Sequence, residues 1–286
     1  MPGNPFQDPR LTEQRSDQAL PAQPTLLVLD YPGRRPEAHV SEMHLDQGGF
    51  DSVYALTPPL PTALTTPAYA RQLCERLRPD RPVAVVSYCA AAPLAIAMAG
   101  LLAGPAGSPL PITFLNPSQT QPYDIAREYA AAVAQIEGRA PDIKRPPLLD
   151  IERLLATPEM LVRRIETDLR LRATLALAAF GFDGADASGP TDTVVGIYVD
   201  WLTFLVAAHH CEQPVPNGQF LQVISQEEPA DVSWLGGADL RTVRIACDRL
   251  ELAMHAETRA AVLGFLRQFA LSASATPGYE ELGHAG

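Results

Sequence analysis

The segment from Val83 to Pro93 constrains the fold more than any other stretch of this chain. Residues 81–87 contain an unbroken apolar run at 83–86, which is typical of a strand buried on both faces. Residues 89–102 follow at once with an alanine-rich helical pattern, and Pro93 falls in the first turn, where its missing N–H costs nothing. The chain must therefore pass from a buried strand into a helix through a very sharp turn at Tyr88 and Cys89.

Short apolar runs and helical patterns alternate on both sides of this segment. We expect strands at residues 25–30, 51–56, 81–87, 110–115, 219–225 and 241–246, and helices at 66–78, 89–102 and 257–269. Continuous apolar strands separated by helices indicate an α/β fold with a mostly parallel sheet covered on both faces.

One long stretch, residues 120–215, interrupts this alternation. It carries helical patterns at 124–136, 150–155, 158–180 and 193–210 and no convincing strand. An all-helical insertion between parallel strands lies at their carboxyl ends, where ligands bind. We therefore expect a core formed by 25–119 and 216–271, a helical lid at 120–215, and flexible ends at 1–24 and 272–286.

Composition narrows the possible partners and compartments. The formal net charge is −11, and lysines and arginines form no cluster, which argues against nucleic acid and anionic membranes as partners. The 4 cysteines are far apart and form no CxxC pair, so neither a disulfide framework nor a structural zinc site is expected. Without a signal-peptide pattern or an apolar run of about 20 residues, the sequence predicts a cytoplasmic protein. The oligomeric state stays open.

The sharp turn resembles the nucleophile elbow of α/β-hydrolases, usually Gly-x-Ser-x-Gly, which needs small residues two positions before and after the nucleophile. Here Ser87 and Ala91 are the small residues, and Cys89 is in the nucleophile position. A helix N-terminus favours the thiolate, and the Ala90 amide can donate to a developing oxyanion. The alternative is an inert, buried cysteine at a strand–helix junction.

The second oxyanion donor should come from the loop after the first strand. In Tyr31-Pro32-Gly33 the proline has no N–H, so Tyr31 or Gly33 must donate.

A general base should follow the last strand, and His255 lies there, just before the final helix. The alternative for His255 is an exposed loop residue. His209 and His210 end a helical pattern and are better read as capping its last carbonyls. A metal site formed by this pair with Cys211 and Glu212 is disfavoured, because no second set of ligands appears at metal spacing. No metal is expected.

Two residues can complete a triad with Cys89 and His255. Asn116 ends the strand at 110–115, and Glu228 follows the strand at 219–225. A thiolate–imidazolium pair needs only an orienting acceptor, so Cys–His–Asn is chemically sensible, and glutamate would also serve. Asn116 could instead be a turn residue before a proline, and Glu228 a solvated loop acid. Asn116 is slightly favoured, and the choice stays open.

These motifs, in this order, resemble the thioesterases of nonribosomal peptide and polyketide synthesis, over roughly residues 25–270. The resemblance rests on residues 26–33 (LLVLDYPG), residues 53–59 (VYALTPP), the elbow at 87–91, the helical lid and His255. It implies that Cys89 is the nucleophile and His255 the base, with Asn116 as in synthetase-integrated members or Glu228 as in many stand-alone members. It also implies an acyl or peptidyl thioester substrate on the phosphopantetheine arm of a carrier protein, and no cofactor of the chain's own.

The chain departs from that family in two places. The nucleophile is cysteine rather than the commoner serine, and the usual glycine-rich stretch after the first strand is replaced by Gly33-Arg34-Arg35-Pro36. Two other functions stay open: a cysteine hydrolase of free esters or lactones, similar to dienelactone hydrolases, and a non-catalytic binding protein that keeps the fold.

Overall fold

The computed structural model describes residues 23–31, 37–79, 82–103, 109–140, 149–182, 184–211, 218–229 and 239–274. Most of the two ends predicted to be flexible lies outside these ranges. The last helix, however, runs to Ser274, so residues 272–274 are helical rather than part of a loose tail.

Within the described residues, six parallel strands form one sheet in the order β2-β1-β3-β4-β5-β6. The strands are β1 (Thr25–Leu29), β2 (Asp51–Tyr54), β3 (Ala84–Tyr88), β4 (Ile112–Leu115), β5 (Gln219–Ile224) and β6 (Asp239–Arg244). All six were predicted from their apolar runs. The last, β6, lies two residues earlier than expected because Asp239 and Leu240 pair with Gln219 and Phe220 of β5.

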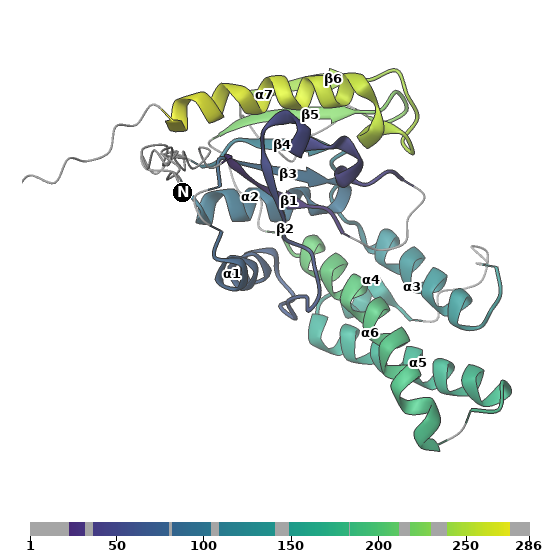
Figure 1. Cartoon of the computed structure of the whole chain (residues 1–286). Coiled ribbons are helices and arrows are strands. Elements are labelled where there is room, and N and C mark those ends of the chain that lie inside the picture. The colour runs from purple at the N-terminus through teal and green to yellow at the C-terminus, as the bar shows by residue number, and fades with distance from the viewer. Residues whose placement is uncertain are drawn as a thin grey trace, which may run out of the picture.

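Helices cover both faces of the sheet, as a parallel sheet requires. In Figure 1, α1 (Thr66–Leu77) and α2 (Ala92–Leu101) lie on one face, and α7 (Ala256–Ser274) lies along the other. Successive strand residues alternate between the two cores. Leu27 and Val85 pack on the α1–α2 side, whereas Leu26 and Val86 pack on the α7 side.

The helical insertion lies between β4 and β5 and contains α3 (Pro122–Ile136), α4 (Ile151–Leu154), α5 (Pro158–Ala179) and α6 (Gly184–His209). In Figure 1, α5 and α6 pack side by side and extend away from the sheet. Helix α6 begins at Gly184, well before the predicted start near Thr193. Pro190 lies inside it, and a proline inside a helical pattern lowers the helical expectation for the residues around it.

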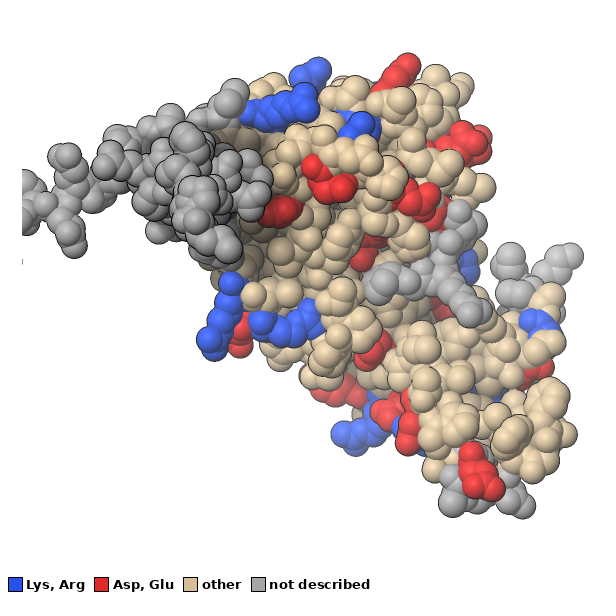
Figure 2. All heavy atoms as spheres, in the orientation of Figure 1, with Lys and Arg blue, Asp and Glu red and all other residues tan. Residues whose placement is uncertain are grey.

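The surface of the insertion is unusually apolar at its far end. Large apolar side chains are exposed on α5, on α6 and in the turn between them, with Phe180 at 82% and Ile197 at 58% exposure. On the face in Figure 2, lysine and arginine side chains are scattered rather than gathered into one patch. By length and composition Ser188–His209 could cross a membrane, but half of its most apolar window is buried inside the protein, as in the core helix of a folded domain.

Candidate active site

The turn after β3 has the backbone of a nucleophile elbow. Tyr88 is extended, Cys89 has φ of +50°, and the short 3₁₀ segment Cys89–Ala91 leads directly into α2. A non-glycine residue in the left-handed region is strained by roughly 1–3 kcal/mol and is typical of functional turns. Ser87 is fully buried and Ala91 is 2% exposed, so larger side chains would not fit at either position. This explains the small residues around Cys89.

The Cys89 thiol is half-buried and has two hydrogen-bonding partners within the described part of the chain. The Ser118 hydroxyl, from the loop after β4, lies 3.2 Å from Sγ, and either atom can be the donor. Arg249 Nη2 donates to Sγ at 3.0 Å. The sulfur is therefore not sealed in an apolar core, and a full positive charge touches it.

Arg249 comes from the loop after β6 and is held by two carboxylates. Its Nε donates to Glu37 at 3.1 Å, and its Nη1 donates to Glu228. Burial opposes the charge of the guanidinium, but the neighbouring Cys89, Glu228, Tyr88 and Glu37 outweigh it and raise the pKa of Arg249 above its ordinary value. Arg249 is therefore a permanent cation at the elbow.

The hydrogen bonds of His255 differ from those that a general base requires. Its backbone amide donates to Leu252 O, and its ring Nδ1 accepts a hydrogen bond from the Glu257 amide at 3.3 Å. The ring thus caps the start of α7. A neutral imidazole that accepts at Nδ1 carries its proton at Nε2, so neither nitrogen is free to take a proton from a thiol in this arrangement. Within the described part of the chain, Arg249 and not His255 meets the sulfur. The assignment of His255 as the base stays a prediction that this geometry does not favour.

The two candidates for the third member of the triad have different roles. Asn116 is buried with φ of +42°; its Oδ1 accepts from the Ser225 amide at 2.8 Å, and its Nδ2 donates to the Ser225 hydroxyl. It joins the ends of β4 and β5. This role resembles the alternative considered for it, that of a turn residue before a proline. Glu228 binds Arg249 at the elbow. Within the described part of the chain neither residue forms a hydrogen bond or ion pair with His255. The orienting role of either residue therefore stays a prediction.

The oxyanion donors can be placed only in part. Ala90 follows Cys89 in the 3₁₀ segment and is half-buried. Tyr31 lies just beyond β1, the strand that pairs with β3, while Gly33 lies outside the described residues. The predicted roles of Ala90, Tyr31 and Gly33 therefore stay predictions.

An aromatic wall from the insertion closes one side of this region. The Tyr31 ring lies 4.4 Å from Trp201 and 5.7 Å from Phe204, ring centre to ring centre, and both partners belong to α6. Burial, followed by the charge of Asp200, raises the pKa of Tyr31, and burial also raises the pKa of Asp200. The wall is therefore largely apolar, with the Asp200 carboxylate beside it, and Trp201 Nε1 donates to the Glu128 carboxylate at 3.2 Å.

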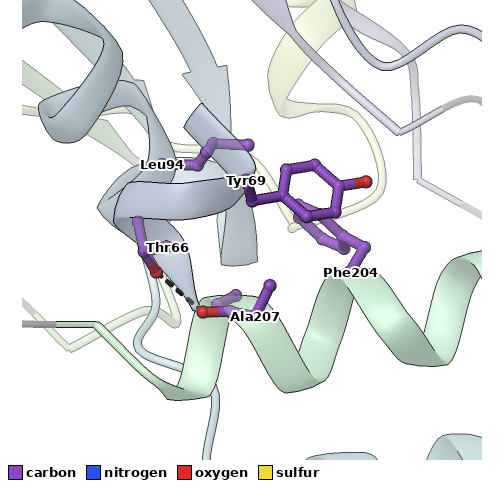
Figure 3. Close-up of a pocket in the computed structure, with 6 residues that line it drawn as sticks. Thr66, Tyr69, Leu94, Phe204 and Ala207 are labelled. Carbon is purple, nitrogen blue, oxygen red and sulfur yellow. Dashed lines mark hydrogen bonds between the residues drawn. The ribbon is translucent and has the colours of Figure 1, made fainter. Parts of the chain in front are cut away.

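Behind this wall, α6 docks on the core through a small apolar crevice. Figure 3 shows Tyr69 against Phe204, with the Thr66 hydroxyl donating to the Ala207 carbonyl at 2.7 Å. The crevice is lined by side chains in mutual contact and leaves no room for a water molecule. It anchors the insertion and is not a substrate site.

The histidines at the end of α6 make local contacts. His209 Nδ1 lies 2.9 Å from the Thr120 carbonyl, and Gln119 donates to Cys211 Sγ. Burial, then the charge of His209, lowers the pKa of His210. Within the described ranges no group of three or more His, Cys, Asp or Glu side chains could hold a metal ion, and Glu212 lies outside those ranges.

Sequence reasoning missed Ser118 and Arg249, which contact the thiol, and Glu37, which binds Arg249. A search for a proton acceptor passes over Arg249, because a guanidinium has no acceptor and does not lose its proton. The available signal was its position, two residues beyond Cys247 in the loop where this fold carries its base. Ser118 also had a positional signal, since it follows Asn116 at the carboxyl end of a strand neighbouring β3.

The six-stranded parallel sheet, the elbow after β3 and the helical insertion after β4 together define an α/β-hydrolase fold. The predicted fold class is therefore confirmed. No family model matches the sequence, and no curated protein matches it.

Several solved structures are similar to this chain. A four-domain nonribosomal peptide synthetase bound to AMP and glycine is 14% identical with a TM-score of 0.47; the match covers 90% of this chain, which spans only 20% of the synthetase. The NocB thioesterase domain, bound to a nocardicin G analog, is 14% identical with a TM-score of 0.42, covering 87% of this chain and 95% of that domain. A protein described as an epoxide hydrolase from Pseudomonas aeruginosa is 15% identical with a TM-score of 0.48. That match covers 88% of this chain and 89% of that protein. At these scores the likenesses assign no function.

Proposed function

We propose that this chain is an enzyme of thioester chemistry: a thioesterase or acyltransferase that forms an acyl-enzyme on Cys89. Its substrate is an acyl or peptidyl group carried as a thioester on the phosphopantetheine arm of a carrier protein, in nonribosomal peptide or polyketide biosynthesis. The observation that carries the proposal is the half-buried Cys89 thiol at a left-handed elbow, in contact with a guanidinium and a hydroxyl.

The nucleophile's identity bears on the reaction. A serine ester lies well below a thioester in free energy, so loading a serine is effectively one-way. A Cys89 acyl-enzyme is itself a thioester, so loading is nearly isoenergetic and reversible. Such an intermediate suits both hydrolysis and transfer of the acyl group to another nucleophile. The rings of Trp201 and Phe204 on α6, packed beside Tyr31, offer apolar surface for an acyl chain.

The substrate class follows from the resemblance in motif order and from the size of the insertion. The helices α3, α4, α5 and α6 in the described part of the insertion are more than a small free ester or lactone requires. A non-catalytic binding role is the second candidate, because in the described part of the chain no imidazole or carboxylate contacts the sulfur.

The proposal is tested by incubating the full chain with an acylated carrier protein and measuring acyl mass on Cys89 by peptide mass spectrometry. We expect an adduct in the wild type and in a Cys211→Ala control, and none in Cys89→Ala. Turnover of free esters or lactones without any carrier-derived adduct would point to the small-molecule hydrolase. An absence of adduct and turnover with every substrate would favour the binding protein.

The predicted base is tested separately with His255→Ala. If His255 takes the thiol proton, acylation of Cys89 slows by several orders of magnitude. If His255 only caps α7, acylation is unchanged and unfolding becomes easier by about 1 kcal/mol. Single-turnover acylation and chemical denaturation of the same variant distinguish the two outcomes.

A further inference from the structure

Arg249 presents its three guanidinium nitrogens to three different groups. Nε faces Glu37, Nη1 faces Glu228, and Nη2 faces Cys89 Sγ at 3.0 Å. A guanidinium is planar and rigid, so fixing two of its nitrogens also fixes the direction of the third. The two carboxylates, which come from the segment after β1 and the loop after β5, therefore aim one N–H of Arg249 at the sulfur.

This arrangement provides charge at the sulfur but no proton acceptor. Arginine donates through all its nitrogens and accepts through none. The Ser118 hydroxyl, 3.2 Å from Sγ, can donate a second hydrogen bond to a thiolate. Both contacts therefore stabilise negative charge on Cys89, and neither can take a proton from an incoming molecule.

We propose that Arg249 is a catalytic residue that holds Cys89 as a thiolate, and that the acyl group leaves Cys89 by transfer to a second thiol rather than to water. The acceptor part rests on the proposed acyl-enzyme function, whereas the part concerning Arg249 does not.

The two half-reactions balance without a base. In loading, the Cys89 thiolate attacks the thioester carbonyl, its sulfur–carbon bond forms, and the carrier's carbon–sulfur bond breaks. The carrier sulfur leaves with the electron pair as a thiolate and is protonated by solvent. In unloading, an acceptor thiol that has lost its proton to solvent attacks the acyl carbon. Cys89 then leaves as a thiolate, again beside Arg249, so the same cation serves both directions.

Attack by water, unlike attack by a thiolate, requires a base. Water must lose a proton as it attacks, and the two groups that contact Sγ in the described part of the chain are a guanidinium and a hydroxyl. Neither is a base of useful strength near neutral pH. Thiols ionise far more readily than water, so an acceptor thiol can reach the site already as a thiolate and needs no base there. The site is therefore suited to thioester exchange, with a second phosphopantetheine thiol or a small free thiol as acceptor.

The two carboxylates also compete with Cys89 for the charge of Arg249. Glu37 and Glu228 are partly buried, with side-chain exposures of 17% and 22%, so solvent does not fully screen them. Their position on the other two nitrogens leaves Nη2 as the donor to sulfur. The net effect of Arg249 on the Cys89 thiol is therefore measured through the reactivity of Cys89 itself.

The first arm measures iodoacetamide alkylation of Cys89 at neutral pH, which requires no acyl substrate. We expect Arg249→Met to slow alkylation by at least about tenfold and Arg249→Lys to restore part of the rate, since a cation at the sulfur favours the thiolate. The matched control is Arg170→Met, because Arg170 is exposed on α5 and pairs with Asp192 and Glu166. Unchanged Cys89 alkylation in a folded Arg249→Met variant would overturn the role of Arg249. Alkylation of Cys74 in the same samples, together with thermal melts, reports whether each variant is folded.

The second arm measures the lifetime of acyl-Cys89 after loading, in buffer alone and with added pantetheine. We expect slow loss in buffer and loss at least about tenfold faster with the thiol, since attack by thiol needs no base. Equally rapid loss in buffer would overturn the thiol acceptor. If no adduct forms at all but Arg249→Met still slows alkylation, the proposed function fails while the role of Arg249 stands.

Discussion

Two thiols lie at the carboxyl edge of the sheet, and their surroundings are opposite. Cys89, after β3, is half-buried and touches a guanidinium and a hydroxyl. Cys247, after β6, is 8% exposed and packs among the apolar side chains under α7. Burial, followed by the negative charges of Asp248, Glu251 and Glu257, raises the pKa of Cys247. The same side chain thus meets a charged group in one loop and apolar packing in the other, and we expect this difference in environment to decide which thiol reacts.

The largest expected effect is a difference in alkylation between these two thiols. At neutral pH we expect iodoacetamide to label Cys89 at least about 100-fold faster than Cys247, because the thiolate is the reacting form. Peptide mapping by mass spectrometry over a time course measures both rates in one sample. Cys89→Ala should remove the fast label and Cys247→Ala should leave it. Similar alkylation rates at both positions would mean that the two environments do not make the thiols differ in reactivity.

The next effect concerns the support beneath Ser118, the hydroxyl partner of Cys89. Asn116→Ala removes both hydrogen bonds to Ser225 and leaves buried polar groups unpaired, so we expect a loss of about 3 kcal/mol in the free energy of unfolding. Urea denaturation measures it. The control is Asn116→Asp, which keeps the acceptor for the Ser225 amide and should lose less. A loss below about 0.5 kcal/mol in the alanine variant would mean that the Asn116–Ser225 pair does not join the two strand ends.

A smaller loss is expected from crowding the elbow. Ala91→Leu places a large side chain where the residue is 2% exposed, so the free energy of unfolding should fall by about 2 kcal/mol. The Cys89 alkylation rate should change too, because the elbow must shift. Ala97→Leu, on α2 beyond the elbow and only partly buried, is the matched control. Equal stability of the two variants would show that the elbow is looser than its sterics imply.

The smallest effect is expected at Cys247. Glu251→Gln removes one of the charges that raise the pKa of this thiol, and we expect its alkylation to speed up about two- to threefold. Glu166→Gln, on exposed α5, is the control and should leave the rate unchanged. An unchanged rate in Glu251→Gln would mean that packing alone, and not charge, protects Cys247.

The raised pKa of Cys247 also links stability to pH. Above the ordinary thiol value of about 8.5 the unfolded chain has lost this proton while the folded chain still holds it. The folded state then binds more protons, so stability falls as pH rises through that range. In Cys247→Ala the fall should be shallower, as measured by thermal melts across the alkaline range. An unchanged slope would assign the alkaline loss to other groups.

Much of the architecture could be read from local pattern. The apolar runs predicted all six strands, and the break in their rhythm predicted the helical insertion. The elbow was visible because its steric demand is local: Ser87 and Ala91 must be small whatever surrounds them. The errors lay where local pattern is weakest, as at β6, whose ends depend on pairing with β5, and at the start of α6, where Pro190 obscures the helix.

The sequence alone determined that a cysteine stands at a sharp turn between a buried strand and a helix, because the small residues Ser87 and Ala91 on either side of it allow such a turn. Only the tertiary structure decided what meets the sulfur. Arg249 is separated from Cys89 by 160 positions along the chain. It reaches the thiol because β6 and the loop after it place it there, and because Glu37 and Glu228 orient its guanidinium. His255 lies nearby in sequence but caps a helix instead. Contacts of this kind depend on the direction of individual side chains, which no periodicity or spacing encodes.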